Sequence, residues 1–165
     1  MEATAVQEPV ASTSVQSFNE EQIVVLDLAG ESYGVEIGRV QEIIRMQPIT
    51  QVPNGPEFVE GVTNLRGRVI PVLDLRQRFG LEATPPTRRS RIVVAELNQH
   101  TVGLVVDGVS EVLRVRGDIV EPPSSLVTTG DTTFLRGVAK LTDRLVLLLD
   151  LSRVLSGQEV DDLAA

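Results

Sequence analysis

The chain has 165 residues and a formal net charge of −8, with no cysteine, no tryptophan and only 3% aromatic residues. The absence of cysteine excludes disulfides, thiolate metal sites and cysteine nucleophiles, and no apolar stretch approaches the roughly 20 residues that span a bilayer. The acidic charge lies mostly at the two ends, so the remainder is nearly neutral and carries no basic footprint for nucleic acid.

Both ends of the chain are expected to be tails. Residues 1–22 contain four Glu and no Lys or Arg, and we expect residues 1–20 to form a disordered, solvated tail. This segment has no basic start and no apolar middle, which argues against a signal peptide and favours a cytoplasmic protein. Residues 158–165 are expected to form a second acidic tail. The folded domain is therefore predicted to span residues 21–157.

The elements expected after the first tail are short strands. A β-rich run at 23–28 is followed by turn-forming residues and a second strand, which predicts a hairpin. A third short strand is expected at 41–46, followed by a connection that contains proline. Two further apolar runs, 61–66 and 68–75, are joined by a tight turn. Asp74 then stands where its side chain can cap a short closing helix.

The same order of elements occurs twice. Residues 23–45 align with residues 92–114 at a shift of 69, without gaps and with eight of 23 positions identical. Residues 58–79 align with residues 134–155 at a shift of 76, with eight of 22 identical. Asp150 is the counterpart of Asp74 and is expected to cap a second closing helix. An internal duplication is therefore visible in this one sequence.

Five short strands with almost no helix, in a unit of about 70 residues, are typical of a small closed barrel. The sequence predicts an all-β fold of two tandem five-stranded barrels, with a short helix closing each half. The first barrel is expected at about 21–80 and the second at about 90–157.

The two copies differ at the turn between the fourth and fifth strands. Asn64, Arg66 and Gly67 of the first copy correspond to Lys140, Thr142 and Asp143 of the second. Residues that match are explained most simply by the shared fold, whereas residues that differ are candidates for function. Arg66 is therefore interpreted either as a solvated turn residue or as a guanidinium that pairs with a carboxylate. That carboxylate belongs to Glu42 of the same barrel or to a partner protein.

The residues of a catalytic centre are missing from the sequence. His100 is the only histidine and is expected in a hairpin turn, so no Ser-His-Asp set and no histidine metal cluster can be assembled. Asp74 and Asp150 are explained as helix caps, and Asp107 precedes a glycine in a predicted turn. There is no glycine-rich phosphate loop. We expect no enzyme activity, no metal and no cofactor, and the abundant strand edges favour a protein that binds other proteins.

Three consecutive motifs resemble the CheW family of bacterial chemotaxis adaptors: "YGVEIGRVQEIIR", "GVTNLRGRVIPVLDLRQRFGL" and "VGLVVDGVSEVL". The resemblance covers about residues 20 to 157. It implies two SH3-like barrels and a non-enzymatic scaffold that couples the cytoplasmic tips of chemoreceptors (methyl-accepting proteins) to the histidine kinase CheA. Two alternatives stay open, namely an adaptor of a related pilus or surface-motility pathway and a small-molecule-sensing module with a pocket between the barrels.

The resemblance also implies sites and a location. The protein would be cytoplasmic and recruited to membrane-associated receptor arrays without inserting into the membrane, and rings of CheA and CheW-like proteins are compatible with it. The regulatory domain of CheA would contact a face of the first barrel that carries Ile37, Val40, Glu42, Asn64 and Arg66. The receptor tip would dock in a groove between the barrels, for which we expect contributions from Leu73, Ile92, Val105 and Val112.

Overall fold

A computed structural model describes residues 20–53, 55–122 and 134–154 of the chain. The tails expected at the two ends lie outside these residues, except that Glu20 begins the first strand. Short strands dominate the described residues, as the sequence predicted. The strands are β2 (Glu20–Leu28), β3 (Glu31–Glu36), β4 (Val40–Arg45), β5 (Val59–Leu65), β6 (Arg68–Asp74), β7 (Arg91–Leu97), β8 (His100–Val106), β9 (Gly108–Arg116), β10 (Val120–Glu121), β11 (Leu135–Lys140) and β12 (Leu145–Leu149). The helices are α3 (Leu75–Arg78) and the 3-10 turns η1 (Ile37–Arg39), η2 (Gly117–Ile119) and η4 (Leu151–Arg153).

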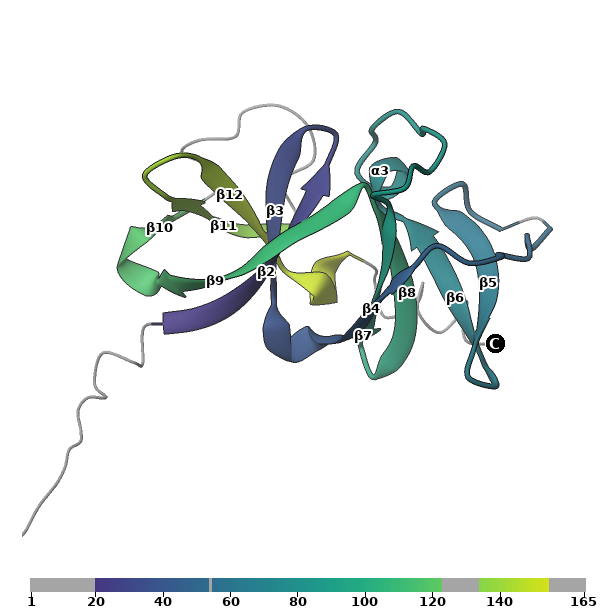
Figure 1. The fold of residues 1–165 in the computed structure, drawn as a ribbon. Helices are drawn as coiled ribbons and strands as arrows, with labels where there is room; N and C mark the ends of the chain where they lie inside the picture. Colours follow the sequence, from purple (N-terminus) through teal and green to yellow (C-terminus); the bar gives the residue numbers. More distant parts are fainter. Residues whose placement is uncertain (1–19, 54, 123–133, 155–165) are drawn as a thin grey trace, which may run out of the picture.

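The strands form two sheets that lie side by side (Figure 1). One sheet has the order β10-β11-β12-β3-β2-β9, and is called the β2 barrel below. The other has the order β4-β7-β8-β6-β5, and is called the β7 barrel. The ends of each sheet are joined. In the β2 barrel η2 links β9 to β10, and in the β7 barrel Thr50, beyond β4, pairs with Val62 of β5.

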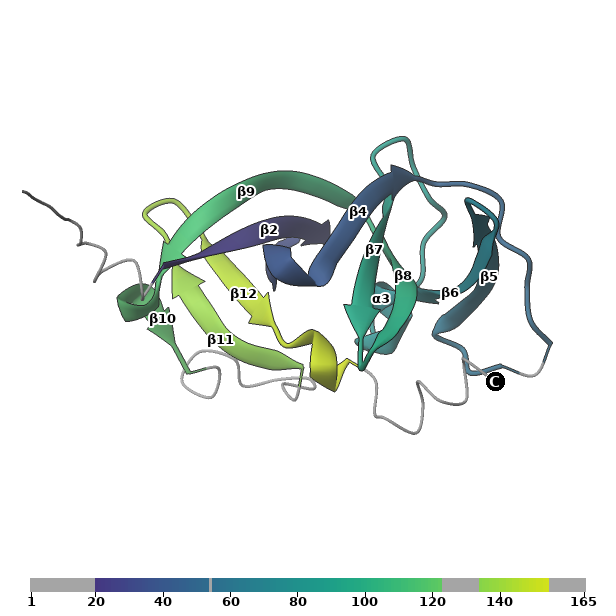
Figure 2. The same cartoon turned by 90° about the horizontal axis from the view of Figure 1, so that it is seen from below.

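The barrels do not follow one another along the chain, which corrects the predicted boundaries at about 21–80 and 90–157. The hairpin β2–β3 of the first copy lies in the barrel built by β9 to β12 of the second copy. The hairpin β7–β8 of the second copy lies in the barrel built by β4, β5 and β6 of the first. The two copies have therefore exchanged their hairpins, and the chain crosses between barrels several times (Figure 2).

The duplication is visible in the strand register after this exchange. Leu148 of β12 pairs in parallel with Gly34 of β3, and Val72 of β6 pairs in parallel with Gly103 of β8. These pairs are related by the shifts of 76 and 69 found in the sequence. A Cβ at Gly34 or at Gly103 would lie within 3.0 Å of the isoleucine that begins the apolar run of the neighbouring strand, so each barrel needs glycine there for close strand packing.

Apolar side chains are buried in three clusters, one within each barrel and one between them. Ile23 of β2 lies in the cluster inside the β2 barrel, and Ile92 of β7 lies in the equivalent cluster inside the β7 barrel. The next residues, Val24 and Val93, point the other way, into the large cluster between the barrels. The hairpin strands are thus buried on both faces, which explains why their sequences are continuous apolar runs rather than alternating ones.

The closing helices begin as the sequence predicted. The Asp74 carboxylate accepts a hydrogen bond from the Arg76 amide at the start of α3, and Asp150 accepts one from the Ser152 amide at the start of η4. Both distances are 3.0 Å, so both aspartates are helix caps. Asp107 does more than terminate a turn, because its carboxylate also accepts two hydrogen bonds from the Arg76 guanidinium, at 2.9 and 2.7 Å.

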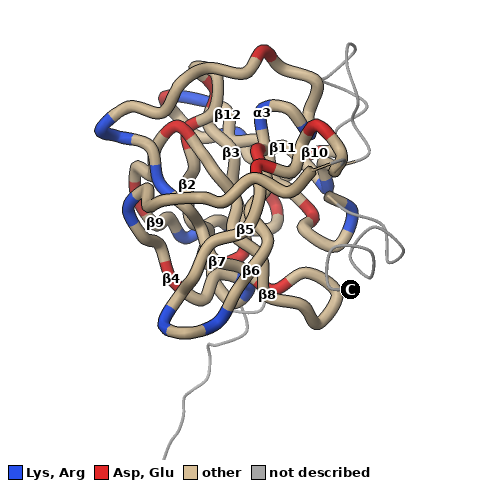
Figure 3. Tube along the Cα trace, turned by 90° about the vertical axis from the view of Figure 1, so that its right-hand side faces the viewer, with Lys and Arg blue, Asp and Glu red and all other residues tan. Residues whose placement is uncertain are grey.

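Basic and acidic residues are interspersed along the trace of the described residues (Figure 3). Within those residues no helix is long and apolar enough to cross a membrane. The same part of the chain contains no group of three or more His, Asp or Glu side chains placed to hold a metal ion.

Candidate protein-binding site

The turn between β5 and β6 is made by Arg66 and Gly67. Both residues have positive φ, 53° and 85°, as a two-residue turn that matches the twist of the hairpin requires. Asn64 supports this turn, since its side-chain oxygen accepts a hydrogen bond from the Gly67 amide at 2.8 Å. The sequence "NLRG" thus combines a residue that holds the turn, a glycine that permits it and an arginine projected from its tip.

The Arg66 guanidinium pairs with Glu42 of β4 through two parallel hydrogen bonds. Arg66 Nη2 donates to Glu42 Oε1 at 2.8 Å, and Nη1 donates to Oε2. This hydrogen bonding lowers the pKa of the Glu42 carboxyl and raises that of Arg66. The pair connects β4 to the β5–β6 hairpin, next to a side-chain link in which Gln47 donates to Thr63 Oγ1 at 2.9 Å. Of the two partners that the sequence left open for Arg66, the structure places Glu42 in contact with it.

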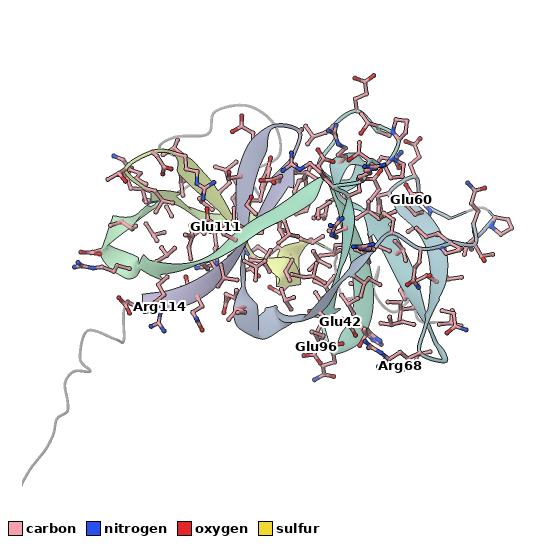
Figure 4. All side chains as sticks on the ribbon, viewed as in Figure 1. Glu42, Glu60, Arg68, Glu96, Glu111 and Arg114 are labelled. Carbon is pink, nitrogen blue, oxygen red and sulfur yellow. The ribbon has the colours of Figure 1, made fainter. Side chains whose placement is uncertain are left out.

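The β2 barrel has an equivalent ion pair between Glu111 of β9 and Arg144. Glu111 is the counterpart of Glu42, and Figure 4 shows the two glutamates on different barrels. Arg144, however, is the counterpart of Arg68 and not of Arg66. The ion pair therefore recurs, while the arginine has moved by two positions across the turn.

The two arginines differ in exposure. The Arg66 side chain is 72% exposed, whereas that of Arg144 is 30% exposed. Glu42 uses two of the five N–H donors of Arg66. Because both groups stay charged and are already paired, the site is unsuited to proton transfer. It suits recognition of a polar group on another protein.

Exposed apolar side chains accompany both ion pairs. Ile43 follows Glu42 on β4 and is 39% exposed, and Val69 on the adjacent hairpin is 67% exposed. Their counterparts, Val112 and Leu145, are 50% and 48% exposed. Four of the six large hydrophobic residues exposed in the described part of the chain are therefore two pairs of counterparts, one pair on each barrel, on or next to the strands that carry the ion pairs.

Below, the first patch is Glu42, Ile43, Arg66 and Val69, and the second is Glu111, Val112, Arg144 and Leu145. The sequence comparison missed Ile43, Val69 and Leu145. The exposed positions of β4 alternate with half-buried ones, so strand alternation was the signal that could have identified Ile43.

The residues expected to contact the kinase lie at or near the first patch. Ile37 begins η1 and is 39% exposed, and Val40 is half-buried at the start of β4. Asn64 is exposed on β5 beside the turn. The structure thus brings the Glu42–Arg66 pair together and places Val40 and Asn64 on the two strands that the pair links.

The residues expected to contact the receptor do not form one exposed set. Leu73 and Ile92 have no exposed surface, since Leu73 packs in the cluster between the barrels and Ile92 inside the β7 barrel. A partner cannot touch them in this structure, so these two assignments are wrong. Val105 is half-buried, and Val112 lies in the second patch on the β2 barrel.

The architecture defines a class before any relative is considered. Two barrels that exchange hairpins, buried apolar clusters and a recurring surface ion pair are typical of a scaffold domain. The CheW-like domain family matches residues 22–159. The chain is 35% identical to chemotaxis protein CheW of Klebsiella aerogenes, across 85% of this chain and 84% of that protein. It is 33% identical to chemotaxis protein CheW of Helicobacter pylori, across 90% of this chain and 91% of that protein.

A solved structure agrees in fold. The scaffolding protein TtCheW from Thermoanaerobacter tengcongensis has a TM-score of 0.77 and 41% identity, covering 84% of this chain and 96% of that one. The chain belongs to the CheW family of chemotaxis scaffold proteins. Its two sheets are the two SH3-like barrels of that family, as the resemblance implied.

Proposed function

We propose that this chain couples chemoreceptors to the histidine kinase CheA in the cytoplasm, at receptor arrays, and performs no chemistry of its own. The observation that carries the proposal is the pair of equivalent patches, one on each barrel. An adaptor has to hold more than one partner at once, and a duplicated surface provides two places to do so. The barrels can also associate in rings, because each molecule presents both patches.

The first patch is proposed as the contact for the regulatory domain of CheA. Ile43 and Val69 supply apolar area and Arg66 supplies exposed donors, a combination typical of the centre of a protein interface. Arginine is among the residues that contribute most to binding when they are packed against a partner. Ile37, Val40, Glu42 and Asn64 support this surface from η1, β4 and β5.

The second patch is proposed for a further barrel-type partner, either CheA or another CheW-like chain. Each contact would bury about 800 Å² per partner or less. Such contacts give pairs of roughly micromolar affinity. The overall binding becomes tighter when several contacts are made at once in an array. Val105 and Val112 retain accessible surface and stay candidates for the receptor contact.

A small-molecule sensor is the less favoured alternative. It requires a pocket between the barrels, where the described residues instead form a continuous apolar cluster. The larger hollows of the described residues are open and lined by charged side chains such as Arg76, Arg88 and Arg39. A ligand that raised the unfolding temperature of the isolated protein would favour the sensor.

A binding experiment separates these functions. Purified chain is mixed with the CheA regulatory domain and, separately, with a chemoreceptor fragment that contains its cytoplasmic tip. The proposal expects binding to both at tens of micromolar. With full-length CheA in place of its regulatory domain, it expects an increase in autophosphorylation only when the chain and the receptor fragment are both present. Absence of binding to the regulatory domain at these concentrations would contradict it. An adaptor of a pilus pathway would bind the kinase of that pathway in preference to one that controls swimming.

A further inference from the structure

Three arginines gather where β4 ends and β7 begins. Arg45 and Arg91 lie directly opposite each other in the antiparallel pair β4–β7. Arg88 belongs to the loop that leads into β7, and its carbonyl accepts a hydrogen bond from Arg91 Nη1 at 2.8 Å. Like charges directly opposite on neighbouring strands destabilise a sheet. The position of these residues is therefore unfavourable for the fold unless an anion binds them.

No carboxylate neutralises this group within the described residues, whose ion pairs involve other arginines. The arginines next to it are different. Arg76 pairs with Asp107 at 2.7 Å, and Arg89 of the same loop pairs with Asp27 at 3.1 Å. The uncompensated charge is thus confined to one side of the loop.

That side of the loop forms an open hollow of about 480 Å³. Its lining consists of Arg45, Met46, Thr87, Arg88, Ser90 and Arg91. The lining contains three guanidinium groups and no carboxylate. A hollow of this size holds several side chains and not only one small ion.

Acidic residues lie beside the hollow but line other spaces. Asp107 lines a neighbouring hollow with Arg88 and is paired with Arg76. Glu60 and Asp74 line a separate cavity of about 50 Å³, which shares Met46 and Ser90 with the hollow. In the described part of the chain, neither carboxylate forms an ion pair with the three arginines. Burial raises the pKa of both Glu60 and Asp74.

The loop that carries Arg88 is held in place by its own hydrogen bonds. The Thr87 amide donates to Ser90 Oγ at 2.8 Å, and the Ser90 amide donates to the Thr87 carbonyl at 3.1 Å. Arg91 Nη1 also donates to the Ser90 carbonyl at 2.8 Å. The guanidinium of Arg91 is therefore positioned before any ligand arrives, which reduces the entropy lost on binding.

We propose that this hollow, named the arginine hollow, binds an acidic segment of a protein partner. Carboxylate side chains match the planar fork of arginine in two-point contacts, and three guanidinium groups at one site favour a segment with several acids over a single one. The site is additional to the proposed kinase contact, although Arg45 lies on the same face of β4 as Ile43 and two residues beyond it.

The test uses the full chain and a fluorescently labelled peptide of eight glutamates, followed by fluorescence anisotropy at low salt. A peptide of eight glutamines is the reference ligand. The double variant Arg45→Gln/Arg91→Gln is compared with the matched variant Arg114→Gln/Arg116→Gln. The control removes the same charge from one strand, β9, where both arginines have acidic partners; Arg114 lies on the other barrel (Figure 4).

The wild-type chain is expected to bind the glutamate peptide, with affinity that falls as salt rises, and not the glutamine peptide. The Arg45/Arg91 variant should bind roughly tenfold more weakly while keeping a cooperative thermal transition. Equal weakening in the Arg114/Arg116 variant would overturn the proposal. Displacement of the peptide by an equal concentration of inorganic phosphate would also overturn it, because the site would then recognise isolated anions.

Discussion

Gly61 tests how the β7 barrel is closed, because it lies at the bulge of β5 where Thr50 pairs with Val62. Its φ is 151°, a region that is rare for residues with a side chain. A Cβ added there would lie 2.7 Å from the Thr50 carbonyl carbon and 3.0 Å from the Gln51 Cα. Both contacts are with backbone, so no rotamer change can relieve them, and the two 2.8 Å hydrogen bonds between Thr50 and Val62 would be disturbed.

The expected cost of Gly61→Ala combines two effects. The backbone conformation costs a residue other than glycine about 1–3 kcal/mol, and overpacking costs about 1–3 kcal/mol. A total near 4 kcal/mol corresponds to a fall in unfolding temperature of about 8–16 °C for a chain of this size. Differential scanning calorimetry or thermal circular dichroism measures this fall.

Gly67→Ala is the matched control, because Gly67 lies in the turn of the same β5–β6 hairpin. Its φ of 85° is also positive, but nothing lies within 4 Å of an added Cβ. The left-handed conformation alone costs about 1–2 kcal/mol, so the unfolding temperature of Gly67→Ala should fall by only about 2–8 °C. If Gly61→Ala melts within about 2 °C of the wild type, or no lower than Gly67→Ala, the account of the barrel closure is wrong.

Two further predictions concern the closing helices. Burial raises the pKa of Asp74 despite its backbone hydrogen bonds. Burial also acts to raise the pKa of Asp150, but the hydrogen bonds from Ser152 and the charges of Arg153 and Arg39 together lower it. The ionised form is therefore disfavoured by folding at Asp74 and favoured at Asp150. At neutral pH, Asp74→Asn should leave the unfolding temperature unchanged or raise it, whereas Asp150→Asn should lower it. The effect of Asp150→Asn should vanish as the pH falls below the usual aspartate pKa of about 4. Thermal unfolding from pH 3 to 8 measures both variants, and the opposite order of the two effects would contradict these pKa directions. The Arg78 guanidinium carbon lies 4.6 and 5.2 Å from the ring centres of Phe58 and Phe134. Arg78→Met should therefore lower the free energy of unfolding, measured by chemical denaturation, by about 1–2 kcal/mol. An unchanged denaturation midpoint would show that these contacts contribute nothing.

The sequence predicted the strands, the duplication and the capping aspartates, but not the exchange of hairpins. The reason is physical. Leu148 packs against Gly34 in the same way as Val72 packs against Gly103, so a hairpin from either copy fits either barrel. A repeat makes these interfaces nearly identical, and local pattern cannot tell which copy supplies the partner strand. The boundary between barrels was therefore the part of the fold that sequence could not fix.

The candidate site was predicted unevenly. The pairing of Arg66 with Glu42 was one of the alternatives that the sequence left open, and the structure shows it. The contrast between Arg66 and Thr142 overstated the difference between the copies, because Arg144 makes the equivalent ion pair from two positions away. Leu73 and Ile92 were misassigned to a groove. Both occur in continuous apolar runs, which are typical of strands buried on both faces and could have indicated that no surface was left for a partner.

The central claim is that the first patch binds a partner and is not needed for folding. Titration calorimetry of the CheA regulatory domain into the wild-type chain and into Arg66→Ala tests it most directly, with thermal unfolding of both proteins measured alongside. Arg66 is 72% exposed and its ion pair is at the surface, so the variant should melt within about 2 °C of the wild type. Its affinity for CheA should be weaker by roughly tenfold or more. Unchanged affinity, or a large loss of stability that explains the loss of binding, would contradict the account.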